Sequence, residues 1–88
     1  MQTLKKIAAM RARKRIECWM WLSEFPAFQH PWLLKPGIVE DICRIPPPLR
    51  RCSKAQIRRT VYAHTHSPEY LQRLKEGGAR VDLFGRPV

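Results

Sequence analysis

The stretch from Ser53 to Arg59 constrains the fold most, because it fixes where a helix begins. Ser53 and Gln56 have the spacing of a capping box. In this motif the serine oxygen accepts from a backbone N–H of the first turn, and the glutamine side chain reaches back to the N–H of the cap. We therefore predict a helix that starts at Ser53 and ends near Thr65.

The predicted helix carries two neighbouring stripes, because successive residues turn by about 100°. Ile57, Val61 and His64 form the stripe that faces the core, and His64 is interpreted as a core or boundary histidine with its polar atoms satisfied. The second stripe lies beside the first and holds Lys54, Arg58, Tyr62 and Thr65. Arg59 points nearly opposite to Ile57.

The charges around this helix are of one sign. Residues 42–68 contain no Asp or Glu, yet they hold Arg44, Arg50, Arg51, Lys54, Arg58 and Arg59. A solvated helix normally mixes both signs, since like charges four residues apart repel each other. The whole chain has 17 Lys and Arg against seven acids, a net charge of +10. This balance favours nucleic acid as the partner, ahead of an anionic membrane or an acidic protein.

The length of 88 residues allows one small domain, and the 44% hydrophobic fraction indicates a folded chain rather than a basic tail. The three cysteines are an odd number, and the amino terminus has no apolar leader core. We expect free thiols buried as small hydrophobes in a reducing cytoplasm, without a membrane span. The eight-residue gap between Cys43 and Cys52 is unlike zinc-ligand spacing. No catalytic constellation is present, so we expect neither an enzyme nor a cofactor.

The first part of the chain divides into an arm and a helix. Residues 1–15 form a basic N-terminal arm whose cations point all round the helical wheel, and we expect it to be helical at most when bound. Residues 16–24 then read as the first core helix, with Ile16, Trp19 and Met20 facing the core. The arm is therefore predicted to precede a domain of residues 16–88.

The remaining elements follow from prolines, glycines and apolar spacing. The aromatic core anchors of a proline-punctuated loop are Phe25, Phe28 and Trp32. A helix over 36–44, which ends before three prolines, has the apolar stripe Ile38, Ile42 and Ile45. Ser67-Pro68-Glu69 starts a helix that Gly77-Gly78 ends, and 80–83 alternates as a strand with almost no return strand after it.

Several of these segments together resemble a known family. They are Leu34-Lys35-Pro36-Gly37-Ile38 with Asp41-Ile42, Ser53-Lys54-Ala55-Gln56-Ile57-Arg58, Tyr70-Leu71, and Gly78-Ala79-Arg80-Val81-Asp82-Leu83 with Gly85 and Pro87. In order and spacing, this set is similar to the RNA-binding domain of the ProQ/FinO family of bacterial RNA chaperones. The resemblance runs from about residue 16 to residue 88 and lacks the family's usual closing elements, so a minimal or truncated member is expected.

The resemblance implies a mostly helical α+β fold, with short helices and a small C-terminal β element. It also implies binding of structured RNA: small RNAs, mRNA 3′ ends and terminator hairpins followed by a 3′ oligo-uridine tail. The site residues expected for RNA are Lys35, Arg51, Lys54, Arg58, Tyr70 and Arg80. Of these, Tyr70 and Arg80 match the family's pocket for the 3′ end, and a turn at Gly77-Gly78 can bring them together. Tyr70 as a plain core anchor is the alternative.

Two other functions remain open from the sequence. One is a DNA-binding helix-turn-helix built on the Ser53 helix, although that helix follows prolines rather than a packed partner helix. The other is a protein-interaction or membrane-surface module that uses the basic arm. The sequence leaves the oligomeric state open, and a monomer is favoured.

Overall fold

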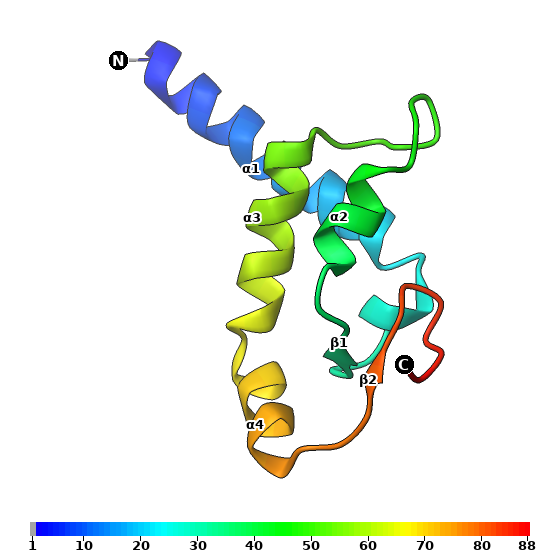
Figure 1. The fold of residues 1–88 in the computed structure, drawn as a ribbon. Coiled ribbons are helices and arrows are strands. Elements are labelled where there is room, and N and C mark those ends of the chain that lie inside the picture. The colour runs from blue at the N-terminus through cyan, green and yellow to red at the C-terminus, as the bar shows by residue number, and fades with distance from the viewer. Residues whose placement is uncertain (1) are drawn as a thin grey trace.

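The computed structural model describes residues 2–88, and from residue 13 onward it describes every side chain. Figure 1 shows helices α1 to α4 and strands β1 and β2 along the chain. Their bounds are α1 Gln2–Leu22, the short 3-10 helix η1 Pro26–Phe28, β1 Leu33–Leu34, α2 Ile38–Cys43, α3 Lys54–Thr65, α4 Pro68–Glu76 and β2 Arg80–Val81. The expected fold class, mostly helical α+β, is confirmed.

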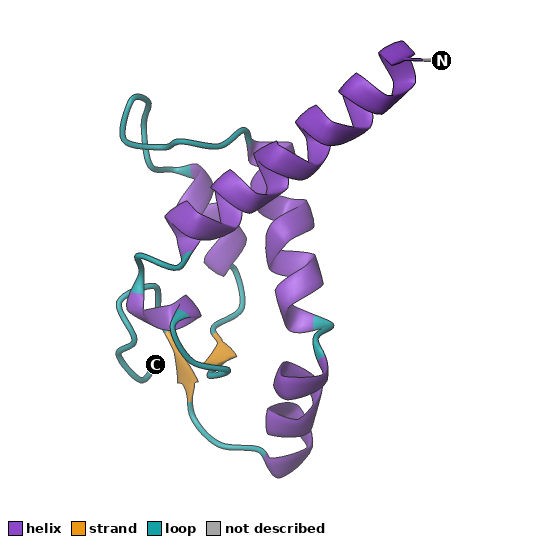
Figure 2. Ribbon diagram, turned by 180° about the vertical axis from the view of Figure 1, so that it is seen from behind, coloured by secondary structure: helices purple, strands orange, loops and turns teal. Residues whose placement is uncertain are grey.

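The residues of the predicted N-terminal arm form the first part of a long helix. Helix α1 runs without a break from Gln2 to Leu22, and its first turns extend beyond the other elements (Figures 1 and 2). The expectation that residues 1–15 are helical only when bound is therefore wrong for residues 2–15, and Met1 lies outside the described residues. The reason is local, because residues 2–22 contain neither glycine nor proline and are rich in strong helix formers.

The buried face of α1 also differs from the prediction. The buried residues are Cys18, Trp21 and Leu22, whereas Ile16 and Met20 are 60% and 63% exposed. Both sets have helical i, i+3, i+4 spacing, so periodicity alone could not choose between them. The face that is buried is the one that packs against α3 in the fold, so tertiary contacts made the choice.

The core lies where α1, α2 and α3 meet above the strands. Ile42 and Ile57 are fully buried there, together with Phe28, and the predicted stripes of the 36–44 and Ser53 helices are confirmed. Phe25 and Trp32 are partly buried and pack against this cluster. Aromatic residues of the proline-rich loop therefore anchor the core as expected.

The predicted helix caps form as the sequence indicates. The Ser53 Oγ accepts from the Gln56 N–H at 3.2 Å, and the Gln56 Oε1 accepts from the Ser53 N–H at 3.0 Å, which completes the capping box. At the start of α4 the Ser67 Oγ accepts from the Tyr70 N–H. Gly77, with φ of 76°, ends α4.

The strand predicted over residues 80–83 is present as β2, but its partner strand β1 was not predicted. Strand β2 pairs in parallel with β1, with Leu33 opposite Arg80 and Leu34 opposite Val81. A tight turn then brings Pro87 back beside Val81 in an antiparallel bridge, and the Val88 N–H donates to the Arg80 carbonyl at 3.0 Å. The return that seemed almost absent is thus made by the last two residues.

The three cysteines are free thiols, as expected. Cys18 and Cys52 are buried and share a hydrogen bond where α1 meets the start of α3. Burial, followed by this hydrogen bond, raises the pKa of Cys52 to about 12, so the thiol stays protonated at neutral pH.

Candidate nucleic-acid interface

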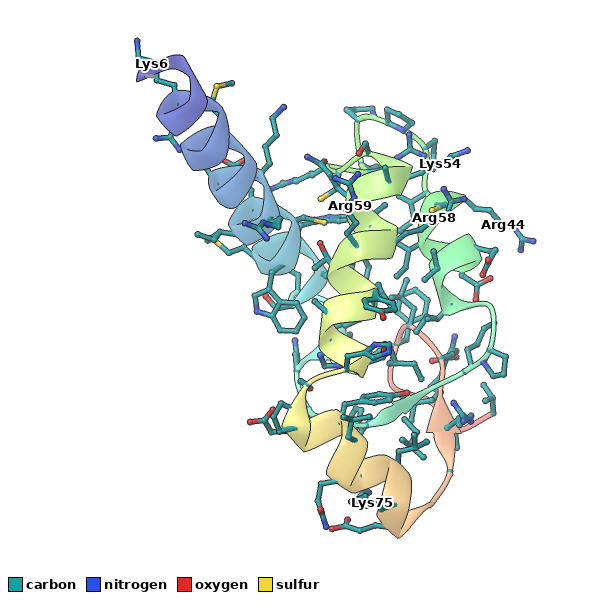
Figure 3. The ribbon with its side chains drawn as sticks, turned by 90° about the vertical axis from the view of Figure 1, so that its left-hand side faces the viewer. Lys6, Arg44, Lys54, Arg58, Arg59 and Lys75 are labelled. Carbon is teal, nitrogen blue, oxygen red and sulfur yellow. The ribbon has the colours of Figure 1, made fainter. Side chains whose placement is uncertain are left out.

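Helix α3 presents its cations on two different sides. Lys54 and Arg58 lie one turn apart on the exposed stripe predicted from the sequence, and Arg59 lies on the side toward α1 (Figure 3). Among the described residues, none of these three cations forms an ion pair. Tyr62 continues the Lys54 stripe, is 64% exposed and stacks on His66 with ring centroids 3.9 Å apart. The stripe therefore offers free positive charge beside an exposed aromatic pair.

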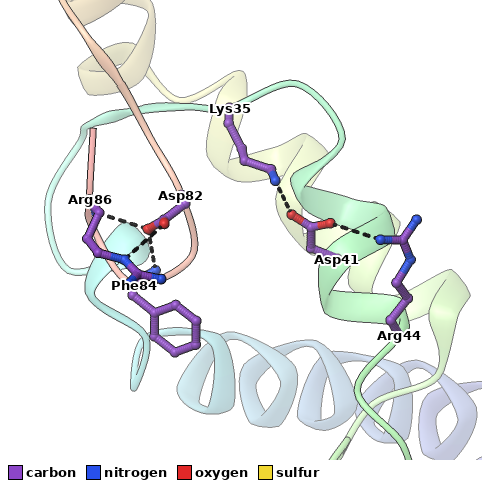
Figure 4. A network of polar contacts seen from close by, with 6 residues as sticks. All are labelled: Lys35, Asp41, Arg44, Asp82, Phe84 and Arg86. Carbon is purple, nitrogen blue, oxygen red and sulfur yellow. Dashed lines mark hydrogen bonds and ion pairs between the residues drawn. The ribbon is translucent and has the colours of Figure 1, made fainter. Parts of the chain in front are cut away.

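Asp41 ties Lys35 and Arg44 together beside this stripe. The Lys35 Nζ lies 2.5 Å from Asp41 Oδ2, and the Arg44 Nη1 lies 3.6 Å from Asp41 Oδ1 (Figure 4). Lys35 is only 29% exposed and is directed onto α2, while Arg44 is 81% exposed. Lys35 is therefore partly neutralised by its partner, and Arg44, which was not among the predicted site residues, is the more available cation of the two.

Tyr70 and Arg80 do come together, and they meet at the backbone of Leu34. The Tyr70 hydroxyl accepts from the Leu34 N–H at 3.1 Å, and the Arg80 Nη1 donates to the Leu34 carbonyl at 2.8 Å. The Tyr70 ring is only 5% exposed, which fits the core-anchor alternative and leaves no open ring face for a base in this structure. Arg80 is exposed, so its remaining N–H donors face solvent.

The turn after β2 is held by Asp82. Its Oδ1 accepts from the backbone N–H groups of Phe84 and Arg86 at 3.0 and 2.9 Å, and its Oδ2 accepts from the Arg86 Nε at 3.1 Å (Figure 4). These contacts lower the pKa of Asp82, and the hydrogen bond from the Arg86 backbone N–H is the largest cause. A methyl group at Gly85 would lie 2.9 Å from the Trp32 ring, so this tight turn packs directly on the aromatic loop.

Arg50 and Arg51 have different roles after the proline loop. The Arg50 Nη1 donates to the Cys43 carbonyl at 2.9 Å, which connects the loop back to α2. Arg51 is exposed and borders a small cavity of about 300 Å³ together with Lys14 of α1. Of the predicted site residues, Arg51 is therefore one that borders the same cavity as a cation of the basic arm.

His64 lies in an aromatic cage. Its ring packs on Trp19 and Phe28 with centroid distances of 5.3 Å, and on Tyr70 at 5.6 Å. Burial lowers the pKa of His64. Its Nε2 is buried, and within residues 2–88 it has no hydrogen-bond partner. The expectation of a satisfied histidine is therefore wrong for this nitrogen, because the side chains that reach it are aromatic rings.

Two features bear on other classes of function. Within residues 2–88, no group of three His, Cys, Asp or Glu side chains could hold a metal ion. No helix in the same range combines the length and apolar character needed to cross a membrane.

The fold and the cation-bearing helix define a class: a small, strongly basic nucleic-acid-binding domain with an acid-free helical stripe. The sequence model of the ProQ/FINO family matches residues 6–88, and the chain belongs to this family of non-enzymatic RNA-binding proteins. A search of curated proteins gives no match. The match includes residues 6–15, so a boundary between arm and domain at residue 15 stays a prediction.

Proposed function

We propose that this protein is an RNA chaperone that recognises the base of terminator-like hairpins with a 3′ uridine tail. It would act on small RNAs and mRNA 3′ ends in post-transcriptional regulation in the bacterial cytoplasm. The observation that carries this proposal is the pair Lys54 and Arg58, which lie on one exposed stripe of α3, have no ion-pair partner among the described residues, and fall within the region that matches the family. Guanidinium and ammonium groups in such a stripe suit consecutive phosphates of one RNA strand.

The predicted residues contact different parts of the RNA in this proposal. Lys54, Arg58 and Arg51 contact phosphates, which positions the RNA without reading its sequence. Arg80 meets the 3′ end, because one of its N–H groups is fixed on the Leu34 carbonyl and the others remain free for a ribose or phosphate oxygen.

In this proposal Lys35 changes its partner when RNA binds, and Tyr70 positions other groups without touching RNA. Lys35 exchanges its contact with Asp41 for the RNA backbone when RNA binds. Tyr70 is a positioning residue, because its hydroxyl holds the N–H of the same Leu34 peptide unit that fixes Arg80.

The test compares one tailed hairpin that ends in a 3′-hydroxyl with the same RNA ending in a 3′-phosphate. Arg80→Ala should erase most of the preference for the hydroxyl, while binding of a duplex through Lys54 and Arg58 persists. Circular dichroism should show that the variant is folded. If Arg80→Ala weakens both RNAs in parallel, or leaves the preference intact, the 3′-end assignment is wrong and only a basic RNA-binding surface remains.

A further inference from the structure

A large groove runs between α1 and α3 on the side away from Lys54 and Arg58. It has a volume of about 790 Å³, is open to solvent, and is bordered by the loop after η1 and by the start of α4, which adds the acidic Glu69 to the lining. Its α3 wall is made by Arg59, Thr60 and Ala63. At about 100° per residue, Thr60 and Ala63 lie on the far side of the helix from the Lys54 stripe, and Arg59 lies between the two sides. The groove is therefore separate from the site proposed above.

The lining combines an aromatic floor with cations from both helices. Trp19 is 38% exposed, and its ring forms a T-shaped pair with Phe28 at a centroid distance of 6.3 Å and a tilted pair with His64 at 5.3 Å. Arg15 of α1 and Arg59 of α3 border the groove, and among the described residues neither forms an ion pair.

Two unpaired guanidinium groups beside an exposed indole suit a ligand in which flat rings alternate with negative charges. Single-stranded nucleic acid has this structure, because bases stack on aromatic side chains while phosphates pair with arginine. A second copy of this chain suits the groove less well, since it would bring two molecules of net charge +10 together.

We propose that this groove binds a short stretch of unpaired RNA, with a base against Trp19 and phosphates on Arg15 and Arg59. This inference rests on the proposed function and extends it. A hairpin on the Lys54 stripe and an unpaired strand in the groove would occupy opposite sides of α3 at the same time. A protein that holds two RNA segments in this way raises the effective concentration of one near the other, which is what annealing requires.

The test uses the full chain, an unlabelled tailed hairpin at saturating concentration, and a fluorescent unpaired oligoribonucleotide with a 3′-phosphate. The oligonucleotide should still bind to the hairpin complex. Ala63→Glu places an acid in the groove at an exposed position, and it should weaken oligonucleotide binding about tenfold, the size of one lost base stack. Hairpin affinity should be unchanged. Arg59→Ala should weaken the oligonucleotide in the same selective way.

Matched variants control for charge and for folding. Gln72→Glu adds the same charge as Ala63→Glu on exposed α4, and Lys75→Ala removes the same charge as Arg59→Ala. Neither residue lines the groove, so both variants should bind the oligonucleotide nearly as the wild type does. Circular dichroism of Ala63→Glu should match that of the wild type.

Each other outcome has one meaning. Displacement of the oligonucleotide by the hairpin, or equal losses for Ala63→Glu and Gln72→Glu, would overturn the groove proposal. So would binding of an acidic amphipathic peptide in the groove with no RNA effect, or a wild-type dimer that Ala63→Glu dissociates. If the wild type binds the hairpin but not the oligonucleotide, only this inference fails. If it does not bind the hairpin, the proposed function fails first.

Discussion

Replacing Tyr70 with phenylalanine should destabilise the fold by about 1–3 kcal/mol, the cost of leaving a buried donor without its acceptor. The change removes only the hydroxyl that accepts from the Leu34 N–H at 3.1 Å. Leu34 is 3% exposed and Tyr70 5% exposed, so water cannot easily replace the lost partner. In a domain of this size, each 1 kcal/mol lowers the Tm by about 4–8 °C.

The measurement is thermal and urea unfolding followed by circular dichroism. Tyr62→Phe is the matched control, because it removes the same hydroxyl from a ring that is 64% exposed. Its stability should change by less than about 0.5 kcal/mol, as is usual for surface substitutions. Equal stabilities of the two variants would show that the Tyr70 hydroxyl does not hold Leu34, and the reasoning about this site would be wrong.

Four further predictions concern binding and pH. Binding to a terminator-like hairpin should weaken with salt at a log–log slope of about −3 to −6, and a slope near zero in filter binding would contradict the electrostatic account. Changing Lys54 and Arg58 together to alanine should cost about 2–4 kcal/mol of hairpin affinity in a gel shift, since hydrogen bonds to charged groups contribute about 1.5–3 kcal/mol each. Arg59→Ala should leave that hairpin affinity unchanged, and an equal loss would mean that the wrong face has been chosen. Deleting residues 1–15 should weaken tailed and untailed hairpins alike and keep the 3′-end preference, whereas selective loss of tailed hairpins would place the arm in the recognition site. Burial lowers the pKa of His64 in the folded chain. As pH falls below the ordinary histidine pKa, the His64 imidazole is therefore protonated in the unfolded chain before it is protonated in the folded chain. Unfolding measurements should show stability decreasing there, and His64→Gln should reduce the decrease.

Local signals predicted the elements they control. The capping box at Ser53, the serine–proline start of α4 and the glycine that ends it each act within one turn of helix, so the sequence contains all the necessary partners. The buried face of α3 followed from the same helix's periodicity. Helix α3 also carries Lys54 and Arg58, so the positions of these two side chains could be predicted from the sequence. Their role in binding stays a proposal.

Features that depend on distant segments were not predictable in the same way. Strand β1 has only two residues and exists because β2, far along the chain, pairs with it. The buried face of α1, with Cys18, Trp21 and Leu22, was decided by packing against the rest of the fold, because apolar spacing fitted two faces equally well. The Asp41 contact of Lys35 and the buried Tyr70 ring likewise require tertiary packing. No sequence motif marks the groove beside Trp19, because its walls come from segments far apart in the sequence.

The bonds at Leu34 affect how variants of the proposed 3′-end site should be interpreted. Tyr70 and Arg80 hold opposite sides of one residue, through its N–H and its carbonyl. Loss of either bond loosens β1, and β1 carries Lys35 into position through the Lys35 N–H bond to the Val81 carbonyl at 2.9 Å. A loss of RNA affinity in a Tyr70 variant can therefore arise without any contact between the tyrosine and RNA. The two causes differ in one measurable respect: a purely structural effect should shrink when an osmolyte stabilises the fold, while a lost contact should not.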